Sequence, residues 1–579
     1  MYHLVGKQWA NQNFFDQFSP DFLNSWGKIN PEFFTIHSEE KVQEWFLMAK
    51  RIIGSLEEHG YVGLVAVTGA GKTVIAYLAI MALNRRSLLL VPQRVMASLE
   101  GHLSTFNALG SPLQMRSITG ETPAKGRLWN EGDDKIILAT AHVAAAEYVN
   151  GKLNPDEFGL VVIDEMQHSA GKPWRILSEA FKNRKMIGMS ASPFENESHR
   201  QKILMHWPIE VWYRPNVIMP EKLLSKVLVE PSEVLQKCKM LCMELLKNRS
   251  GALKLTCQRL EKTYGGFGCV VENPFTTKQQ NLNLEGMEGE LMSEKNLKEV
   301  IVYLDKASKY FKAKSIRPHD FSKVMGLYAQ YRKITHMMKL SQSGTFGALL
   351  SYLKGMEKEK ARYAQALLLS EEVATIKCLA ENPHPKALKL REVVKSCIGW
   401  NQRGLIFVTD KNVGDDLALN YLGDLPENWA VERVYGGRDR NKNKNNETLR
   451  HLAKKEIGFV LCTKVLAEGI TVPSVDVVIL YGAPTTVVEW IQEKGRTGRF
   501  YVGQVIVILG SPDDERAYYS LLHKQKTVLE LTSNLDPSTK HISLPREKKL
   551  KSPSKIKTSQ DETLLLFPEM YLPDSWKVS

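Results

Sequence analysis

The chain has 579 residues, of which 43% are hydrophobic and 24% charged, and its formal net charge is +13. These proportions are ordinary for a folded protein and exclude a mostly disordered, fibrous or membrane-embedded chain, and the length predicts several domains. The basic surplus is compatible with a polyanionic partner, although a basic protein without one has the same composition.

Cysteine usage and the longest apolar runs indicate the compartment. Seven cysteines without a repeated spacing predict reduced thiols and not a secreted disulfide framework. Residues 1–13 contain no apolar run of the kind found in a signal peptide. The longest apolar runs have the length of strands, well short of the ~20 residues of a membrane helix. We therefore expect a cytoplasmic or nucleoid-associated protein that is not secreted and has no membrane partner.

Patterning along the chain predicts five regions. Residues 1–35 are an N-terminal extension rich in aromatic side chains. Over residues 36–212 short β-branched runs alternate with helical stretches, which is typical of a parallel sheet covered on both faces. Strand patterns vanish over residues 222–382, which predicts an all-helical insertion, and they return over residues 385–530. Residues 531–579 are polar and basic, as in a solvated tail. The predicted fold class is α/β.

A glycine-rich turn follows the apolar strand that ends at Val67. Its glycine amides can close around phosphate oxygens, and the helix that begins after it adds partial positive charge. Lys72 would neutralise the β- and γ-phosphates, and the Thr73 hydroxyl would ligate Mg²⁺. A plain helix-starting turn is the alternative, since Ala66 stands where the pattern usually has Gly. The candidate ATP-binding residues of this turn are Thr68, Gly69, Ala70, Gly71, Lys72 and Thr73.

Two carboxylates follow the apolar strand of residues 160–163. Asp164 and Glu165 stand at the carboxyl end of that strand, where α/β sheets bind ligands. Asp164 can hold Mg²⁺, and Glu165 can orient and deprotonate an attacking water. Such a pair is often only surface charge, but its place after the glycine-rich turn in the same α/β region favours the catalytic interpretation.

The second α/β region carries the segment Gln492-Glu493-Lys494-Gly495-Arg496-Thr497-Gly498-Arg499. Two arginines three residues apart, beside glycines that permit close approach, are typical of arginine fingers that stabilise charge on a γ-phosphate. The alternative is a salt-bridged helix start. The candidate catalytic set is therefore Lys72, Asp164, Glu165, Gln492, Arg496 and Arg499.

With these motifs in order, the sequence resembles a superfamily 2 nucleic-acid helicase. The motifs are residues 66–73 (motif I), 164–167 (motif II), 190–192 (motif III), 463–473 (motif V) and 492–499 (motif VI). Further segments, such as Thr119-Gly120-Glu121, 137–142 and 503–526, are similar to the Hef and Fanconi anaemia M group, which is related to double-stranded RNA sensors. The sequence departs from the family at Met166-Gln167, Thr471 and Glu493.

The resemblance implies two RecA-like motor domains with ATP and Mg²⁺ between them, a thumb-like helical insertion that grips duplex, and no nuclease domain. It implies that Gln43 contacts the adenine. It also implies a row of nucleic-acid contacts, which bind phosphate oxygens without recognising bases. These residues are Pro92, Arg94, Thr119, Gly120, Thr140, Thr409, Gly436 and Thr463.

We expect an ATP-dependent DNA helicase or translocase that acts on branched or forked DNA. The alternatives are a double-stranded RNA-dependent ATPase or RNA helicase and a non-enzymatic nucleic-acid-binding protein with a decayed motor. Three weaker patterns stay open: a basic face on the insertion (Arg332, Lys333, His336, Lys339), a thiol metal site (Cys238, Cys242, Cys257, Cys269), and a sliding-clamp-binding peptide (Gln560, Leu564, Leu566, Phe567).

Overall fold

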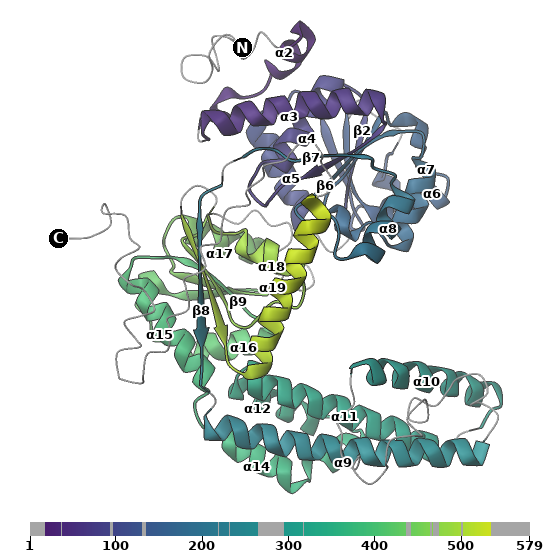
Figure 1. The fold of residues 1–579 in the computed structure, drawn as a ribbon, viewed down its shortest axis with the longest axis vertical. Helices are drawn as coiled ribbons and strands as arrows, with labels where there is room; N and C mark the ends of the chain where they lie inside the picture. Colours follow the sequence, from purple (N-terminus) through teal and green to yellow (C-terminus); the bar gives the residue numbers. More distant parts are fainter. Residues whose placement is uncertain are drawn as a thin grey trace.

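The computed structural model describes residues 18–533 with gaps at 36, 93–95, 130–134, 218, 231, 265–293, 317, 436–441, 464–465, 467–473 and 499–501. In this part, the chain forms two parallel sheets, and a long helical projection extends from the second of them (Figure 1). The predicted α/β class, with two parallel-sheet domains and helices between them in sequence, is confirmed.

The first sheet has seven strands in the order β3-β4-β2-β5-β6-β1-β7. All of its pairs are parallel, so the carboxyl ends of the strands meet at one edge. The central strands are buried along their whole length because helices cover both faces. The strands are β1 (Tyr61–Val65), β2 (Ser87–Val91), β3 (Met115–Ile118), β4 (Ile136–Thr140), β5 (Leu160–Ile163), β6 (Lys185–Ser190) and β7 (Val211–Tyr213).

The helices of the first domain form two apolar clusters, one on each face of the sheet. They are α2 (Pro20–Trp26), α3 (Glu39–Glu58), α4 (Lys72–Leu83), α5 (Met96–Leu109), α6 (Ala141–Val149), α7 (Lys172–Ala180) and α8 (Glu197–His206), with short 3₁₀ turns η1 (Pro31–Phe34), η2 (Ala124–Gly126), η3 (Pro155–Glu157) and η4 (Met166–His168).

The described part of the predicted N-terminal extension, residues 18–35, packs into the first domain. Trp26 is fully buried and its indole N–H donates to the Leu78 carbonyl at 2.9 Å. Phe18 and Phe46 pack edge-on against the same indole. In the described part of this region, Phe18, Trp26 and Phe34 are therefore core residues of the first domain.

The second sheet has six parallel strands in the order β10-β11-β9-β12-β13-β8. Its edge strand β8 falls inside the range 222–382 that we expected to be helical, so that expectation was wrong for these residues. β8 pairs with β13 along its full length, from Lys222–Gly503 to Leu228–Leu509. The strands are β8 (Lys222–Leu228), β9 (Gly404–Phe407), β10 (Val431–Val434), β11 (Phe459–Cys462), β12 (Val477–Leu480) and β13 (Gly503–Leu509).

The second domain also contains α15 (Pro385–Gly399), α16 (Lys411–Asp416), the π-helical η7 (Leu417–Tyr421), the 3₁₀ turn η8 (Glu427–Trp429), α17 (Lys442–Ala453), α18 (Val487–Lys494) and α19 (Pro512–Ser533). The insertion proper begins after β8. Its helices are α9 (Glu233–Tyr264), α10 (Glu294–Ala313), α11 (His319–Ser343), α12 (Phe346–Glu357), α13 (Arg362–Leu368) and α14 (Glu371–Leu379).

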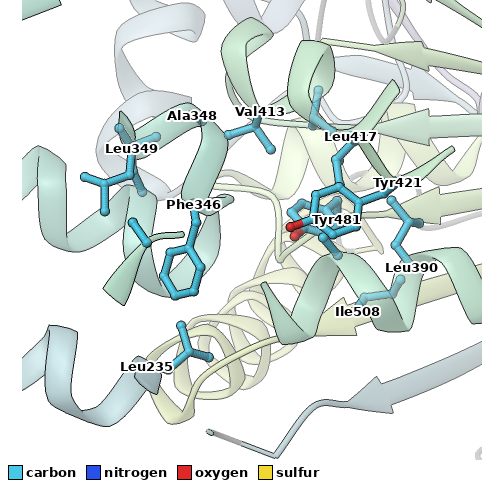
Figure 2. Close-up of a cluster of buried hydrophobic side chains, with 14 of the residues drawn as sticks. Leu235, Phe346, Ala348, Leu349, Leu390, Val413, Leu417, Tyr421, Tyr481 and Ile508 are labelled. Atoms are coloured by element: carbon cyan, nitrogen blue, oxygen red, sulfur yellow. The ribbon is translucent and has the colours of Figure 1, made fainter. Parts of the chain in front are cut away.

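The base of the insertion and the second sheet share one apolar core. Leu235 of α9 and Phe346 of α12 belong to the same buried cluster as Leu390 of α15 and Ile508 of β13, and Figure 2 shows these side chains together. The outer end of the insertion has its own small core, formed by α9, α10 and α11. Because a shared core resists relative motion, the insertion base and the second domain form one packed unit.

A buried ion pair lies at this junction. The Lys386 ammonium is fully buried and donates to Asp514 at 3.0 Å and to the Ser343 carbonyl at 3.1 Å. It also lies over the Tyr481 ring, 4.5 Å from its centroid. Asp514 additionally accepts from the Ser343 hydroxyl and the Gly510 amide. These contacts join α11, α15, the residue after β12 and α19 at one point.

The remaining structural expectations concern membrane spans and thiols. Among the described helices none is both long and apolar enough to cross a bilayer. Burial raises the pKa of the Cys238 thiol to about 11 and that of Cys242 to about 12. Cys257 lies in the separate outer core, and Cys269 falls outside the described residues. Cys238, Cys242 and Cys257 are buried in apolar clusters, and no metal-binding cluster occurs among the described residues.

Candidate active site

The predicted phosphate loop connects β1 to α4. Gly69 and Gly71 have φ angles of 88° and 98°, in the left-handed region that favours glycine. The Lys72 side chain bends back across the loop and donates to the Ala66 carbonyl at 3.0 Å. The Lys72 ammonium therefore lies beside the phosphate loop, at the N-terminus of α4.

The side chain of Trp45 on α3 contacts this loop. Its indole N–H donates to the Ala70 carbonyl at 2.7 Å. A β-carbon on Gly71 would lie 2.1 Å from that indole nitrogen, so the position admits only glycine while the indole stays in place. Gln43, the predicted adenine contact, lies two residues earlier on the same helix, where its amide donates to Glu39 at 2.8 Å.

Asp164 stands directly after β5 and its carboxylate is held at both oxygens. His102 Nε2 lies 2.9 Å from Oδ2, and the Glu165 amide donates to Oδ1 at 2.9 Å. Burial alone would raise the pKa of Asp164. The hydrogen bond and charge of His102 and the charge of Lys72 oppose burial, so the pKa is lowered. Asp164 therefore stays ionised close to Lys72.

Glu165 adopts a left-handed backbone conformation, with φ 50° and ψ 55°. Non-glycine residues rarely adopt it, and such strain gathers at functional sites. Its carboxylate accepts from the Gln167 amide at 2.7 Å, and Gln167 accepts from the Ser190 hydroxyl at 2.6 Å. Ser190 in turn accepts from the Ser192 amide. One hydrogen-bonded chain thus joins Glu165 to the segment after β6.

The second domain brings the segment that follows α18 against the phosphate loop. Thr486 caps α18 by accepting from the Glu489 amide at 3.1 Å, and Glu489 accepts from the Thr485 amide in return. At the far end of this helix, a β-carbon on Gly495 would lie 2.7 Å from Cβ of Thr68 and 2.9 Å from its hydroxyl. The two domains therefore touch where the sequence predicted a shared nucleotide site.

Gln492 and Arg496 lie on either side of the end of α18, and both are buried. Neither amide atom of Gln492 has a hydrogen-bond partner in the described part of the chain, which is unusual for a polar group 4% exposed. The Arg496 amide donates to Glu493. Arg499 falls outside the described residues.

The donor chemistry of this site suits Mg²⁺ with a phosphate ligand. Hydroxyl and carboxylate oxygens are the ligands that Mg²⁺ prefers, and Thr73 and Asp164 supply one of each. Lys72 supplies the positive charge that phosphates require. The Gln492 amide, which has no partner among the described residues, supplies a polar group that a ligand would satisfy.

The predicted nucleic-acid contacts stand where strands end. Pro92 follows β2, Thr140 is the last residue of β4, and both are buried. The Thr119 hydroxyl accepts from the Glu121 amide at 3.1 Å, while Gly120 is exposed. Thr463 follows β11. Arg94 and Gly436 lie outside the described residues.

Thr409 lines a cavity of about 200 Å³ at the ends of β9 and β12, and Lys339 of the insertion lines it too. On the predicted basic face, Arg332 is exposed, whereas Lys333 is bonded to Glu359 at 2.6 Å. His336 packs edge-on against Tyr352. Lys333 and His336 thus make contacts within the insertion. The predicted clamp peptide lies outside the described residues.

Two family models match the chain. The model described as the res subunit of type III restriction enzymes matches residues 36–195, and the helicase conserved C-terminal domain matches residues 386–501. The first match falls on the first sheet and the second on the second sheet, with the insertion between them.

Three relatives that match most of this chain are longer proteins. A Methanocaldococcus jannaschii protein named as an ATP-dependent RNA helicase is 24% identical over 500 residues, covering 81% of this chain and 58% of the relative. The Schizosaccharomyces pombe protein fml2, named as an ATP-dependent DNA helicase, is 22% identical over 520 residues, covering 80% and 61%. The mouse Fanconi anemia group M protein homolog is 20% identical over 521 residues, covering 80% and 25%. The chain thus spans less than two thirds of the length of these relatives.

Among solved structures, the Hef helicase domain of Pyrococcus furiosus matches with a TM-score of 0.54 at 20% identity, covering 82% of this chain and 97% of that chain. At this identity the likeness concerns the fold. It confirms the expected pair of RecA-like domains with a helical insertion between them.

Proposed function

Because the chain is a superfamily 2 helicase of the group that contains Hef and the Fanconi anaemia M proteins, we propose that it couples ATP hydrolysis to movement along branched or forked DNA. The observation that carries the motor part of this proposal is the contact of Gly495 with Thr68, because it joins the segment expected to hold arginine fingers to the phosphate loop. A site divided between two domains can open and close with each nucleotide.

In this proposal the phosphate loop and Lys72 bind the β- and γ-phosphates, and Thr73 and Asp164 hold Mg²⁺. The bound Mg²⁺ neutralises charge that develops on the phosphates. Glu165 orients and deprotonates the attacking water, and Gln167 fixes its carboxylate through the 2.7 Å hydrogen bond. Arg496 and Arg499 stabilise the γ-phosphate from the second domain, beside Gln492.

The relative fml2, which is named as an ATP-dependent DNA helicase, supports DNA as the substrate. The archaeal relative named as an RNA helicase supports the second candidate, duplex RNA. Backbone binding without base recognition predicts a steep loss of affinity with salt for either polymer, so only the ranking of substrates separates the two.

The test is the ATPase rate of the full chain with forked DNA, linear duplex DNA and duplex RNA over a salt series. We expect the highest rate with forked DNA. Stimulation by RNA alone would replace the proposed substrate, and a rate that no nucleic acid raises would overturn the motor.

Glu165→Gln tests the proposed general base. It removes the carboxylate and keeps the shape, so we expect turnover to fall by about two to four orders of magnitude while ATP binding persists. A Glu179→Gln variant on α7, an exposed position of the same domain, is the matched control. Hydrolysis by Glu165→Gln at the wild-type rate would contradict the assignment.

A further inference from the structure

A buried chain of three polar side chains joins the helix after the phosphate loop to Asp164. The Tyr77 hydroxyl of α4 lies 3.2 Å from Nδ1 of His102 on α5, and His102 Nε2 lies 2.9 Å from Asp164 Oδ2. Tyr77 is 2% exposed and His102 3% exposed, so water does not compete for these bonds.

The Tyr77 hydroxyl contacts both the ring and the backbone of His102. Burial and the charge of Asp164 raise the pKa of Tyr77 well above its usual value, so its hydroxyl keeps the proton. That proton is donated to the His102 carbonyl at 3.0 Å, so the hydroxyl oxygen faces Nδ1 as an acceptor. With Nδ1 beside the Tyr77 oxygen, Nε2 on the other side of the ring faces the Asp164 carboxylate.

The hydrogen bonds from Tyr77 through His102 to Asp164 connect the two elements that carry the predicted magnesium ligands, Thr73 and Asp164. Tyr77 lies four residues after Thr73 on α4, so the two side chains share one face of that helix. Asp164 follows β5, and His102 bridges the distance between α4 and that strand end. With one Asp164 oxygen bonded to His102 and the other to the Glu165 amide, the carboxylate plane is fixed and its remaining lone pairs stay available.

We propose that His102 is a positioning residue that orients Asp164 toward the magnesium ion of the bound nucleotide, with Tyr77 fixing the orientation of the imidazole ring. This inference rests on the proposed function of the same site. Groups that hydrogen-bond a metal ligand typically change metal affinity by about 10- to 100-fold when they are removed. A role in Mg²⁺ binding therefore separates His102 from an ordinary core histidine.

The test measures binding of fluorescently labelled ADP to the full chain, with Mg²⁺ and with EDTA. In His102→Ala we expect the affinity gained from Mg²⁺ to fall by about tenfold or more, with the EDTA affinity unchanged. His102→Gln, whose amide reaches the position of Nε2, should recover most of that gain. Tyr77→Phe should lose about fivefold, as expected for one neutral hydrogen bond. The matched control is His142→Ala, an exposed position on α6.

An unchanged Mg²⁺ dependence in His102→Ala, or a His102→Gln variant as impaired as His102→Ala, would overturn the positioning role. A wild-type chain that binds labelled ADP equally with and without Mg²⁺ would overturn it as well. A wild-type chain with Mg²⁺-dependent ADP binding but no nucleic-acid-stimulated hydrolysis would overturn the motor proposal alone, because the ADP measurement contains no nucleic acid.

Discussion

At the residue scale, Gln167 is the link between the proposed general base and the segment after β6. Replacing it with Ala leaves the Glu165 carboxylate without this partner and the Ser190 hydroxyl without an acceptor. Since hydrogen bonds to charged groups contribute about 1.5–3 kcal/mol, we expect Gln167→Ala to lower turnover by about 10- to 100-fold at saturating ATP. The measurement is steady-state ATPase with saturating nucleic acid.

An exposed glutamine on α8, Gln201, offers the matched control, because its amide donates to Glu197 one turn earlier. Gln201→Ala should keep the wild-type turnover. Equal turnover in both variants would show that Glu165 does not depend on Gln167 for its orientation.

At the scale of elements, two neighbouring aspartates at the start of α19 differ in environment. Asp514 pairs with the fully buried Lys386, whereas Asp513 pairs with Lys239 and Arg516 near the surface. Removing one partner of a buried pair typically costs about 3–5 kcal/mol, against about 0–1 kcal/mol for a surface pair. Asp514→Asn should therefore lower the melting temperature far more than Asp513→Asn. Equal melting temperatures would show that Lys386 finds another partner.

The same junction contains a pH-sensitive group. His384 is fully buried, its Nε2 lies 3.1 Å from the Ser341 carbonyl, and its Nδ1 has no partner among the described residues. Its pKa is lowered from 6.5 to about 4, mainly by burial and also by the nearby Lys386 charge, while the Ser341 hydrogen bond and the Asp514 charge oppose this shift. Between pH 4 and pH 6.5 the unfolded chain therefore binds a proton on this histidine more readily than the folded chain does.

The contribution of His384 to the free energy of unfolding should therefore be fully present above pH 6.5. It should fall by roughly 1.4 kcal/mol for each pH unit toward pH 4. His384→Gln removes the titrating group, so its unfolding midpoint in urea should fall less steeply over that window than that of the wild-type chain. Parallel curves for the two proteins would contradict this account.

At the scale of the whole molecule, Gly495 meets Thr68 where the two RecA-like domains touch. A methyl group in Gly495→Ala would lie 2.7 Å from the Thr68 β-carbon, closer than such atoms approach, so the domains must separate or shift. We expect a large loss of turnover and a longer distance between fluorophores placed on the two domains in the ATP-bound state. Gly399→Ala, where the added methyl group meets nothing within 4 Å, is the control. An unchanged distance would show that the domains do not close at this point.

Local patterns predicted most of the architecture because the central strands are continuous apolar runs and the insertion keeps helical periodicity. They did not predict β8, since an edge strand is partly exposed and its partner β13 follows only after the whole insertion. The glycine-rich turn and the carboxylate pair were predicted because each is contiguous. His102 and Trp45 were missed because their roles arise from contacts between separate helices and loops, and a single histidine or tryptophan in a helix has no distinguishing pattern.

The pairing of β8 with β13 has a consequence for biosynthesis. Residues 222–228 leave the ribosome long before residues 503–509 are made. Strand β8 therefore lacks its partner β13 throughout synthesis of the insertion. At about 5–20 residues per second this interval lasts on the order of 15–55 s. During that time the backbone amides and carbonyls of residues 222–228 lack their partner strand, so they are open to pairing with other nascent chains until translation passes residue 509.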